Sequence, residues 1–262
     1  MTPDPPPTRR TVFGPDEVAE AAACVALEGY ATVRGALGGR ELDQLEAQLT
    51  EAQRQLVAGV LDARYGTAVL DDPDATVDGR PFAHYVTFVT EVAPAAAAVV
   101  RAPVVAGLAR SVLGEQAWLL DKEQFGVVYQ DARPGPGSGY SRIGWHTDHQ
   151  SGPHLAIWPG LAFTVHIDPT SPANGFLRVL PRSHLGGTSG MPPGFERVPG
   201  EIALYTERGD LLFHHADLWH AAARATDDGD AAVRRHLRGS WYGGKPLEEG
   251  HGTDDFVKNA RR

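Results

Sequence analysis

The sequence predicts a mainly β protein, an antiparallel sandwich or barrel, packed against a helical N-terminal layer. Up to Leu113-Gly114, apolar residues recur at the spacing typical of helices. After that point the chain breaks into short apolar or alternating runs separated by Gly, Pro, Asn and Asp, a pattern typical of antiparallel β folds. Neither part contains an internal repeat or a linker long enough to separate independent domains.

The N-terminal third is predicted to be helical with one strand. Pro15, followed by two acidic residues, is typical of a helix start. Gly29 ends this helix, and Pro103 breaks a later apolar stretch into two helices. The expected elements are a helix over 14–27, a strand over 30–35, a helix over 40–57 and two short helices within 92–113.

The second part of the chain is predicted to supply seven strands. They are expected over 117–120, 124–129, 161–167, 176–180, 201–205, 210–214 and 234–242. We therefore expect a single domain over residues 1–262. Its parts are a flexible tail at 1–10, a mostly helical support at 11–115, the β core at 116–245 and a C-terminal tail at 246–262.

Composition and charge narrow the class of protein. The chain has 262 residues and a net charge of −9, which argues against nucleic acid and anionic membranes as partners because both require a basic surface. No apolar stretch is long enough for a transmembrane helix, and residues 1–10 lack the apolar core of a signal peptide. Cys24 has no second cysteine to pair with, so a cytoplasmic location is expected.

Histidines give the first indication of a metal, since several of the eleven lie between residues 146 and 220. Mononuclear non-haem iron enzymes use two histidines and one carboxylate, which leaves positions open for co-substrate and O₂. A His-x-Asp pair on extended backbone supplies two such ligands, because residues i and i+2 point the same way about 6.6 Å apart. Three pairs occur: His146/Asp148, His166/Asp168 and His215/Asp217.

The surroundings of these pairs favour the first. The run 146–148 follows a tryptophan and precedes a glycine-containing loop, as expected for a strand end that opens onto a cavity. Asp168 leads into Pro169 and is expected to begin a turn, and the third pair lies too close to His220 to take it as a distant third ligand. Three other histidines are expected to be ordinary hydrogen-bonded residues: His166, His184 and His236.

Three blocks of the sequence carry a family resemblance. The first is Gly144-Trp145-His146-Thr147-Asp148, a His-x-Asp ligand motif. The second, residues 174–184, reads NGFLRVLPRSH and is similar to an NGxLxVxPxSH segment. The third is residues 209–214 followed by Leu218-Trp219-His220. In order and spacing, these blocks resemble the phytanoyl-CoA dioxygenase family of iron(II)/2-oxoglutarate oxygenases, and the likeness runs over about residues 14–242.

The resemblance implies a double-stranded β-helix, a cupin-like jelly-roll with the metal at its open end. It implies an oxygenase that uses Fe(II), 2-oxoglutarate as co-substrate and O₂, with His146, Asp148 and His220 as metal ligands. Such enzymes release succinate and CO₂ while they hydroxylate, desaturate or cyclise a substrate. Halogenating relatives replace the ligand carboxylate by a small residue, so Asp148 favours oxygenation.

The far carboxylate of 2-oxoglutarate requires a cation, and the guanidinium of arginine can bind it through two hydrogen bonds. The resemblance places this arginine on the last core strand, where only one of Arg234 and Arg235 can face inward, and Arg234 aligns better. The family's serine two residues after the distal histidine is Ala222 here, so another donor is expected, and Thr164 is the candidate. Gln130 resembles an active-site glutamine of the ectoine-hydroxylase branch.

The substrate is predicted to be a polar small molecule, as in the biosynthesis of an antibiotic or another secondary metabolite. The candidate contact residues are His149, Gln150, His154, Trp158 and Trp219. The segment after Asp148 does not resemble the ectoine-hydroxylase branch, so ectoine itself is not expected. No basic cluster suits the phosphates of coenzyme A.

Two other classes fit part of the same pattern. One is a non-enzymatic metal- or sugar-binding jelly-roll, which would show no 2-oxoglutarate turnover and no inward arginine. The other is a zinc-dependent hydrolase, because two histidines and one carboxylate also suit Zn²⁺ with an open position. The second sequence block weighs against both. A monomer or homodimer is expected.

Overall fold

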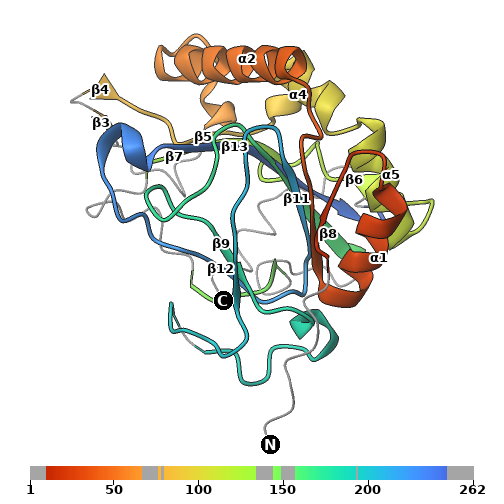
Figure 1. Cartoon of the computed structure of the whole chain (residues 1–262). Coiled ribbons are helices and arrows are strands. Elements are labelled where there is room, and N and C mark those ends of the chain that lie inside the picture. Colours follow the sequence, from red (N-terminus) through yellow and green to blue (C-terminus); the bar gives the residue numbers. More distant parts are fainter. Residues whose placement is uncertain are drawn as a thin grey trace, which may run out of the picture.

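The structure is a computed structural model and describes residues 10–66, 76–77, 80–133, 144–148, 157–192 and 194–246. Within this part of the chain, a large and a small β-sheet face each other, and helices cover the outer face of the large sheet (Figure 1). The helices are α1 (Val18–Glu28), α2 (Gly39–Val57), α3 (Val89–Val92), α4 (Pro94–Val99) and α5 (Pro103–Leu113).

The large sheet has eight strands. Its order is β1 (Val12–Phe13), β2 (Tyr30–Val33), β11 (Leu211–His215), β8 (Gly160–His166), β13 (Arg234–Tyr242), β7 (Val127–Ala132) and β5 (Tyr85–Val86), with β6 (Trp118–Leu119) paired to β13. The small sheet has the order β10 (Ile202–Leu204), β9 (Leu177–Val179) and β12 (His220–Ala222). β3 (Thr76–Val77) and β4 (Arg80–Pro81) form a separate pair.

One face of the large sheet packs against the helices. Leu161, Phe163 and Val165 alternate along β8 and share one buried cluster with Val25 of α1 and Leu45 of α2. Burying a large apolar side chain contributes about 1.5–3 kcal/mol, so this cluster is the main source of stability for the helix–sheet interface. The odd-numbered residues of β8 therefore face the helices.

The other face of the large sheet faces the small sheet. Leu212 of β11 packs against Val179 of β9. Leu212 is in register with Thr164 of β8, which in turn is in register with Arg238 of β13. Because residues paired across a sheet point to the same side, alternate residues of β8, β11 and β13 line the space between the sheets, and we call this side the inward face.

Several predicted elements have shifted ends. The first helix begins at Val18 instead of residue 14, because the N–H of Glu17 donates to the carbonyl of Gly14 and closes a turn first. The strand expected over 124–129 begins at Val127, since the N–H of Gly126 closes another turn. The last strand has its predicted bounds. β5, with two residues, was not predicted.

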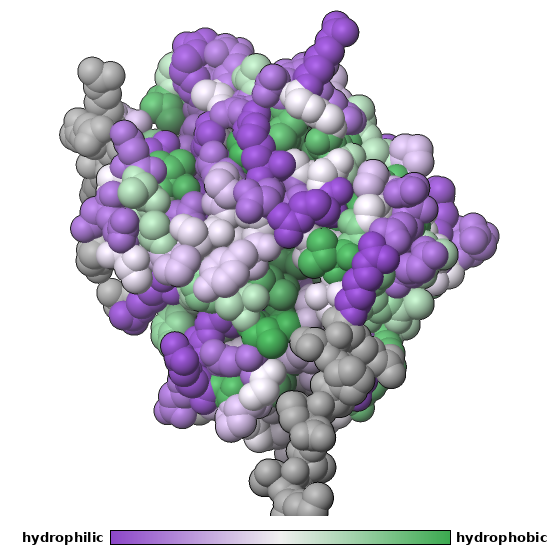
Figure 2. All heavy atoms as spheres, in the orientation of Figure 1, coloured by the Kyte–Doolittle hydropathy of each residue, from purple (hydrophilic) through white to green (hydrophobic). Residues whose placement is uncertain are grey.

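The face of the molecule drawn in Figure 2 intersperses hydrophilic and hydrophobic residues. Six large hydrophobic residues of the described part are exposed: Val12, Leu27, Val57, Val60, Leu185 and Tyr205. None of the helices in the described ranges combines the length and the apolar character that a membrane crossing requires.

Candidate metal centre

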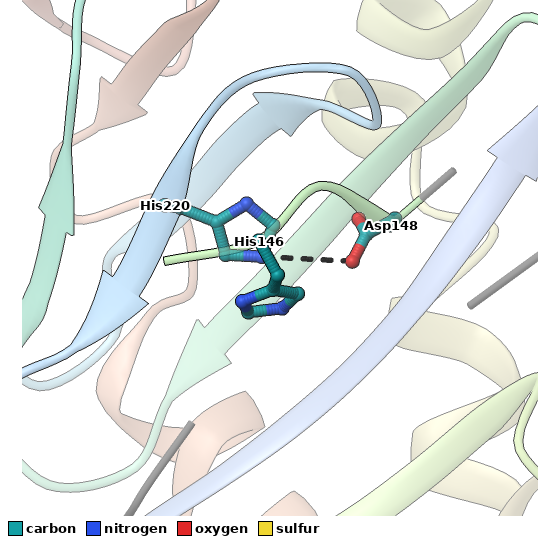
Figure 3. Close-up of side chains that lie close together, drawn as sticks. All are labelled: His146, Asp148 and His220. Carbon is teal, nitrogen blue, oxygen red and sulfur yellow. Dashed lines mark ion pairs between the residues drawn. The ribbon is translucent and has the colours of Figure 1, made fainter. Parts of the chain in front are cut away.

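Three side chains from two distant parts of the chain, His146, Asp148 and His220, meet in the structure (Figure 3). Among the described residues, this is the one group of three or more His, Cys, Asp or Glu whose ligand atoms lie within 4.8 Å of one another. Nε2 of His220 lies 3.5 Å from Oδ1 of Asp148, and the two imidazole centroids are 4.1 Å apart. Two imidazoles and one carboxylate fit a non-haem Fe(II) site with open positions.

Backbone hydrogen bonds hold the three donors together. His146 and His220 form an antiparallel bridge in which each N–H donates to the other's carbonyl at 3.0 Å. The N–H of Asp148 donates to the carbonyl of Ala216 at 2.8 Å. The main chain therefore positions the donors without help from a metal.

The two histidines have the same local arrangement. Nδ1 of His146 lies 2.8 Å from the carbonyl oxygen of Gly144, and Nδ1 of His220 lies 2.9 Å from that of Leu218. A carbonyl oxygen only accepts, so each Nδ1 carries the hydrogen and each Nε2 presents a lone pair. Contacts of this kind fix the tautomer and the ring orientation of metal-binding histidines. Each Nε2 is therefore available to a metal ion.

The protonation states also suit a metal. Burial, followed by the charges of His146 and His214, lowers the pKa of His220 to about 3, so this ring is neutral at neutral pH. Burial alone would raise the pKa of Asp148, but the surrounding histidines, His220 foremost, outweigh it and hold that pKa below its usual value. A carboxylate and a neutral imidazole are the forms that bind metals.

A fourth side chain, His214 of β11, contacts the same cluster. Its Nε2 lies 3.3 Å from Oδ2 of Asp148, and its ring centroid is 4.4 Å from that of His220. The residue is buried. Sequence reasoning did not identify His214, although its position two residues after Leu212 places it on the same inward face. Its contact orients the carboxylate of Asp148.

The other two His-x-Asp pairs do not gather at one point. The carboxylate of Asp168 accepts two hydrogen bonds from Arg235, whereas His166 lies on the inward face of β8. In the third pair, Nδ1 of His215 accepts from the N–H of Asp217 at 3.1 Å, which is a local turn. Neither pair joins a third ligand among the described residues.

The adjacent arginines at the start of β13 face opposite sides of the sheet. Arg235 donates to both oxygens of Asp168 at 2.8 Å and pairs with Glu46 of α2 at 2.7 Å. Arg234 is 8% exposed, and its Nη1 lies beside Gly175 in the loop before β9. Arg234 therefore points to the small sheet, which supports it over Arg235 as the predicted co-substrate anchor.

The segment 174–184 contacts both ends of the site. Nδ2 of Asn174 donates at 3.0 Å to the carbonyl of Val233, just before the buried arginine. Oγ of Ser183 accepts at 2.8 Å from the N–H of Trp219, just before the distal histidine. Through Asn174 and Ser183, the segment therefore fixes the backbone beside Arg234 and beside His220.

The two other predicted co-substrate residues, Gln130 and Thr164, lie on the inward face. Oε1 of Gln130 accepts from Nε of Arg238 at 3.1 Å and lies 3.1 Å from Nε2 of His236. Thr164 is partly buried and in register with Arg238. A contact of either residue with the co-substrate stays a prediction.

Two of the predicted substrate residues are described, and both make contacts within the protein. The indole N–H of Trp158 donates to Oδ1 of Asp217 at 3.1 Å. That of Trp219 donates to the carbonyl of Gly187 at 2.7 Å, and this ring packs with Trp145. Their contact with substrate stays a prediction. Three further candidates lie outside the described residues: His149, Gln150 and His154.

Comparison with known proteins identifies a family. The family model described as phytanoyl-CoA dioxygenase matches residues 26–233. This match spans the His-x-Asp pair, the segment 174–184 and the distal histidine. No curated protein matches the chain.

Solved structures share the fold at low sequence identity. SnoN, an epimerase of nogalamycin biosynthesis crystallised with Fe³⁺, alpha ketoglutarate and nogalamycin RO, is 20% identical, with 91% of this chain and 92% of that chain covered and a TM-score of 0.63. EctD from S. alaskensis with 2-oxoglutarate and 5-hydroxyectoine is 20% identical over 93% and 83%, at 0.62. AviO1 from Streptomyces viridochromogenes Tue57 is 18% identical over 88% and 98%, at 0.61. These likenesses confirm the predicted jelly-roll fold.

Proposed function

The chain belongs to the phytanoyl-CoA dioxygenase family, and we propose that it oxidises a C–H bond of a polar small molecule in secondary metabolism. Membership of that family identifies a 2-oxoglutarate-dependent non-haem iron oxygenase. It also disfavours the zinc hydrolase and the non-enzymatic jelly-roll, which share only the ligand set or only the fold.

The proposed metal ligands are Nε2 of His146, Nε2 of His220 and the carboxylate of Asp148. The observation that carries this proposal is the matched pair of Nδ1 contacts, at 2.8 Å to Gly144 and 2.9 Å to Leu218. Each contact leaves one ring nitrogen free, both histidines belong to the cluster that contains the carboxylate, and the free nitrogen of His220 lies 3.5 Å from it. A ring nitrogen that carries a lone pair gains no hydrogen bond from a neighbouring carboxylate, whereas a metal ion would bind both groups.

Arg234 is proposed to bind the far carboxylate of 2-oxoglutarate. It lies on the inward face, two residues before His236 and four before Arg238. No inward position of β8, β11 or β13 is acidic, so the wall between the sheets is cationic and suits a dianion. Arg235 cannot take this role without giving up Asp168 and Glu46.

The side chains of the protein would hold the metal and orient the substrate, while Fe(II) and 2-oxoglutarate would supply the oxidising chemistry. Fe(II) and 2-oxoglutarate together provide a route to activate O₂ and release succinate and CO₂. His214 holds the carboxylate of Asp148 in place, and the bridge between His146 and His220 fixes both imidazoles. The protein determines which C–H bond of the substrate is presented.

The substrate class is supported by fold-level likeness only. SnoN and SnoK are an epimerase and a carbocyclase of nogalamycin biosynthesis, and EctD was solved with 5-hydroxyectoine. The small molecules in these solved structures, nogalamycin RO and 5-hydroxyectoine, differ from one another. We therefore propose a secondary metabolite as substrate, oxidised by hydroxylation, desaturation or ring closure.

Anaerobic reconstitution with Fe(II) and 2-oxoglutarate tests this function. We expect one iron per chain and a visible charge-transfer band that appears only when both are present. His146→Ala should lose iron and band, and Arg234→Ala should keep iron but lose the band at moderate 2-oxoglutarate concentration. Arg235→Ala is the matched control and should keep both. Bound iron with no band at saturating 2-oxoglutarate would contradict the proposal.

A further inference from the structure

His166 is buried with both ring nitrogens unused. The residue is 6% exposed, and neither Nδ1 nor Nε2 finds a hydrogen-bond partner among the described residues. Leaving a buried polar group without a partner costs about 1–3 kcal/mol, so such a group indicates a ligand that would satisfy it. The expectation of an ordinary hydrogen-bonded histidine is therefore wrong at this position.

The ring of His166 lies next to the proposed co-substrate anchor. His166 ends β8 and is in register with His236 of β13, and their ring centroids are 6.1 Å apart. Arg234 lies two residues before His236 on the same face and is also buried. One arginine and two neutral imidazoles thus form a buried corner on the inward face.

The charge state of this corner suits a hydrogen bond to an anion. Burial, followed by the charge of Arg234, lowers the pKa of His166 to about 3, so the ring is neutral and one nitrogen carries a hydrogen to donate. His236 already directs its Nε2 at Oε1 of Gln130. The nearest carboxylate along β8, that of Asp168, is bound to Arg235.

The same corner lacks a hydroxyl at position 222. That residue is Ala222 in this chain, on β12 of the facing sheet. The other candidate donor, Thr164, lies two residues before His166 on β8 and is less buried than His166. Of the two imidazoles in this corner, His166 is the one with both ring nitrogens buried and unpaired, because Nε2 of His236 faces Gln130.

We propose that a ring N–H of His166 donates a hydrogen bond to the far carboxylate of 2-oxoglutarate, beside Arg234, in place of the hydroxyl absent at Ala222. This inference rests on the proposed function and adds to it a residue that binds the co-substrate. It also makes Thr164 unnecessary as the second donor.

Two ligands that differ only at the far end test the contact. 2-Oxopentanoate has the chain length of 2-oxoglutarate but a methyl group in place of the far carboxylate. Calorimetric titration of the anaerobic Fe(II) protein gives the Kd of each ligand without turnover. We expect His166→Ala to weaken 2-oxoglutarate binding by about tenfold to a hundredfold and to leave 2-oxopentanoate binding unchanged. His166→Asn, which retains an N–H, should recover part of the loss, and His215→Ala, on the outward face of β11, should bind both ligands like the wild type.

The other outcomes of these titrations distinguish failure of this inference from failure of the proposed function. If His166→Ala binds 2-oxoglutarate like the wild type while Arg234→Ala does not, the inference is overturned and the proposed function stands. The inference also fails if Thr164→Val shows the loss instead. A wild-type protein that binds iron but neither ligand overturns the proposed function itself.

A second measurement does not depend on how the variants fold. In the zinc-loaded wild type with ¹⁵N-labelled histidine, the ring N–H of His166 should shift when 2-oxoglutarate is added. The resonance should not shift with 2-oxopentanoate. Equal shifts with both ligands, or no shift with 2-oxoglutarate at saturation, would overturn the inference.

Discussion

Nη1 of Arg234 occupies the space beside Gly175 in which a side chain would begin: a Cβ built on this glycine would lie only 2.9 Å from that atom. The same Cβ would lie 2.6 Å from the carbonyl oxygen of Ala223. Gly175 also has a φ of +82°, which favours glycine. The glycine is therefore part of the arginine's binding geometry.

Gly175→Ala is expected to weaken 2-oxoglutarate binding while iron binding is retained. The added methyl group pushes on the guanidinium of Arg234, and the metal ligands lie elsewhere. Gly190→Ala is the matched control, because Gly190 has a φ of +85° and nothing within 4 Å of its Cβ position. Titration measures the 2-oxoglutarate affinity of both variants. Equal affinities would contradict this account, because only the methyl group at position 175 contacts Arg234.

His214→Gln is expected to reduce iron affinity by about tenfold to a hundredfold, the usual cost of losing a contact behind a metal ligand. The substitution removes the hydrogen bond at 3.3 Å that holds Asp148. His215→Gln is the control, because its side chain points to the opposite side of the same strand. Competition with a chelator measures both affinities. An unchanged affinity in His214→Gln would remove its assigned role.

Ser183→Ala is expected to destabilise the fold by about 1–3 kcal/mol. Oγ of Ser183 donates to the carbonyl of Leu180 and accepts from the N–H of Trp219, both at 2.8 Å, and the variant leaves the N–H of Trp219 unpaired, because the Leu180 carbonyl still accepts from the backbone N–H of residue 183. The exposed Ser189→Ala should have no effect. Urea denaturation of the metal-free protein measures the difference, and a Ser183→Ala protein as stable as wild type would contradict the account of this motif.

Stability of the metal-free protein is expected to fall below about pH 6.5, the ordinary pKa of histidine. Burial, then the charge of Arg234, lowers the folded-state pKa of His166 to about 3 and that of His236 well below its usual value. Unfolded chains take up these protons and the folded protein does not, at about 1.4 kcal/mol per pH unit for each histidine. This stability is complete above pH 6.5 and is lost as the pH falls toward the folded pKa.

His166→Gln tests the contribution of His166 to this pH dependence. Between about pH 6 and pH 4 its free energy of unfolding should change less steeply than that of the wild type, by about 1.4 kcal/mol per pH unit. Parallel curves for His166→Gln and wild type would show that His166 is protonated in the folded protein.

Much of the fold was predictable because local patterns determine it. Turn residues separate the strands, and the strand at Arg234–Tyr242 has its expected bounds. The misses have local causes: β5 has two residues, too few for a visible alternation, and two turns delay the starts of α1 and β7 to Val18 and Val127. The fold class followed from periodicity alone, and the family resemblance specified its topology.

The site was harder to predict from the sequence, because contacts between residues far apart in the chain determine which side chains meet. Period-two alternation places Arg234 and Arg235 on opposite faces but does not say which is inward. The structure shows which one is inward, because Asp168 and Glu46 form ion pairs with Arg235 on the helix-covered face. His214 ends the block 209–214, but that block does not show where its side chain points, and its contact with Asp148 arises from the packing of β11 beside segment 144–148.

The most direct test of the central claim is an anomalous difference map at the iron edge from crystals grown anaerobically with Fe(II). The account predicts one peak, bound by Nε2 of His146, Nε2 of His220 and a carboxylate oxygen of Asp148. A peak bound through Nδ1, or located at another group of side chains, would contradict it.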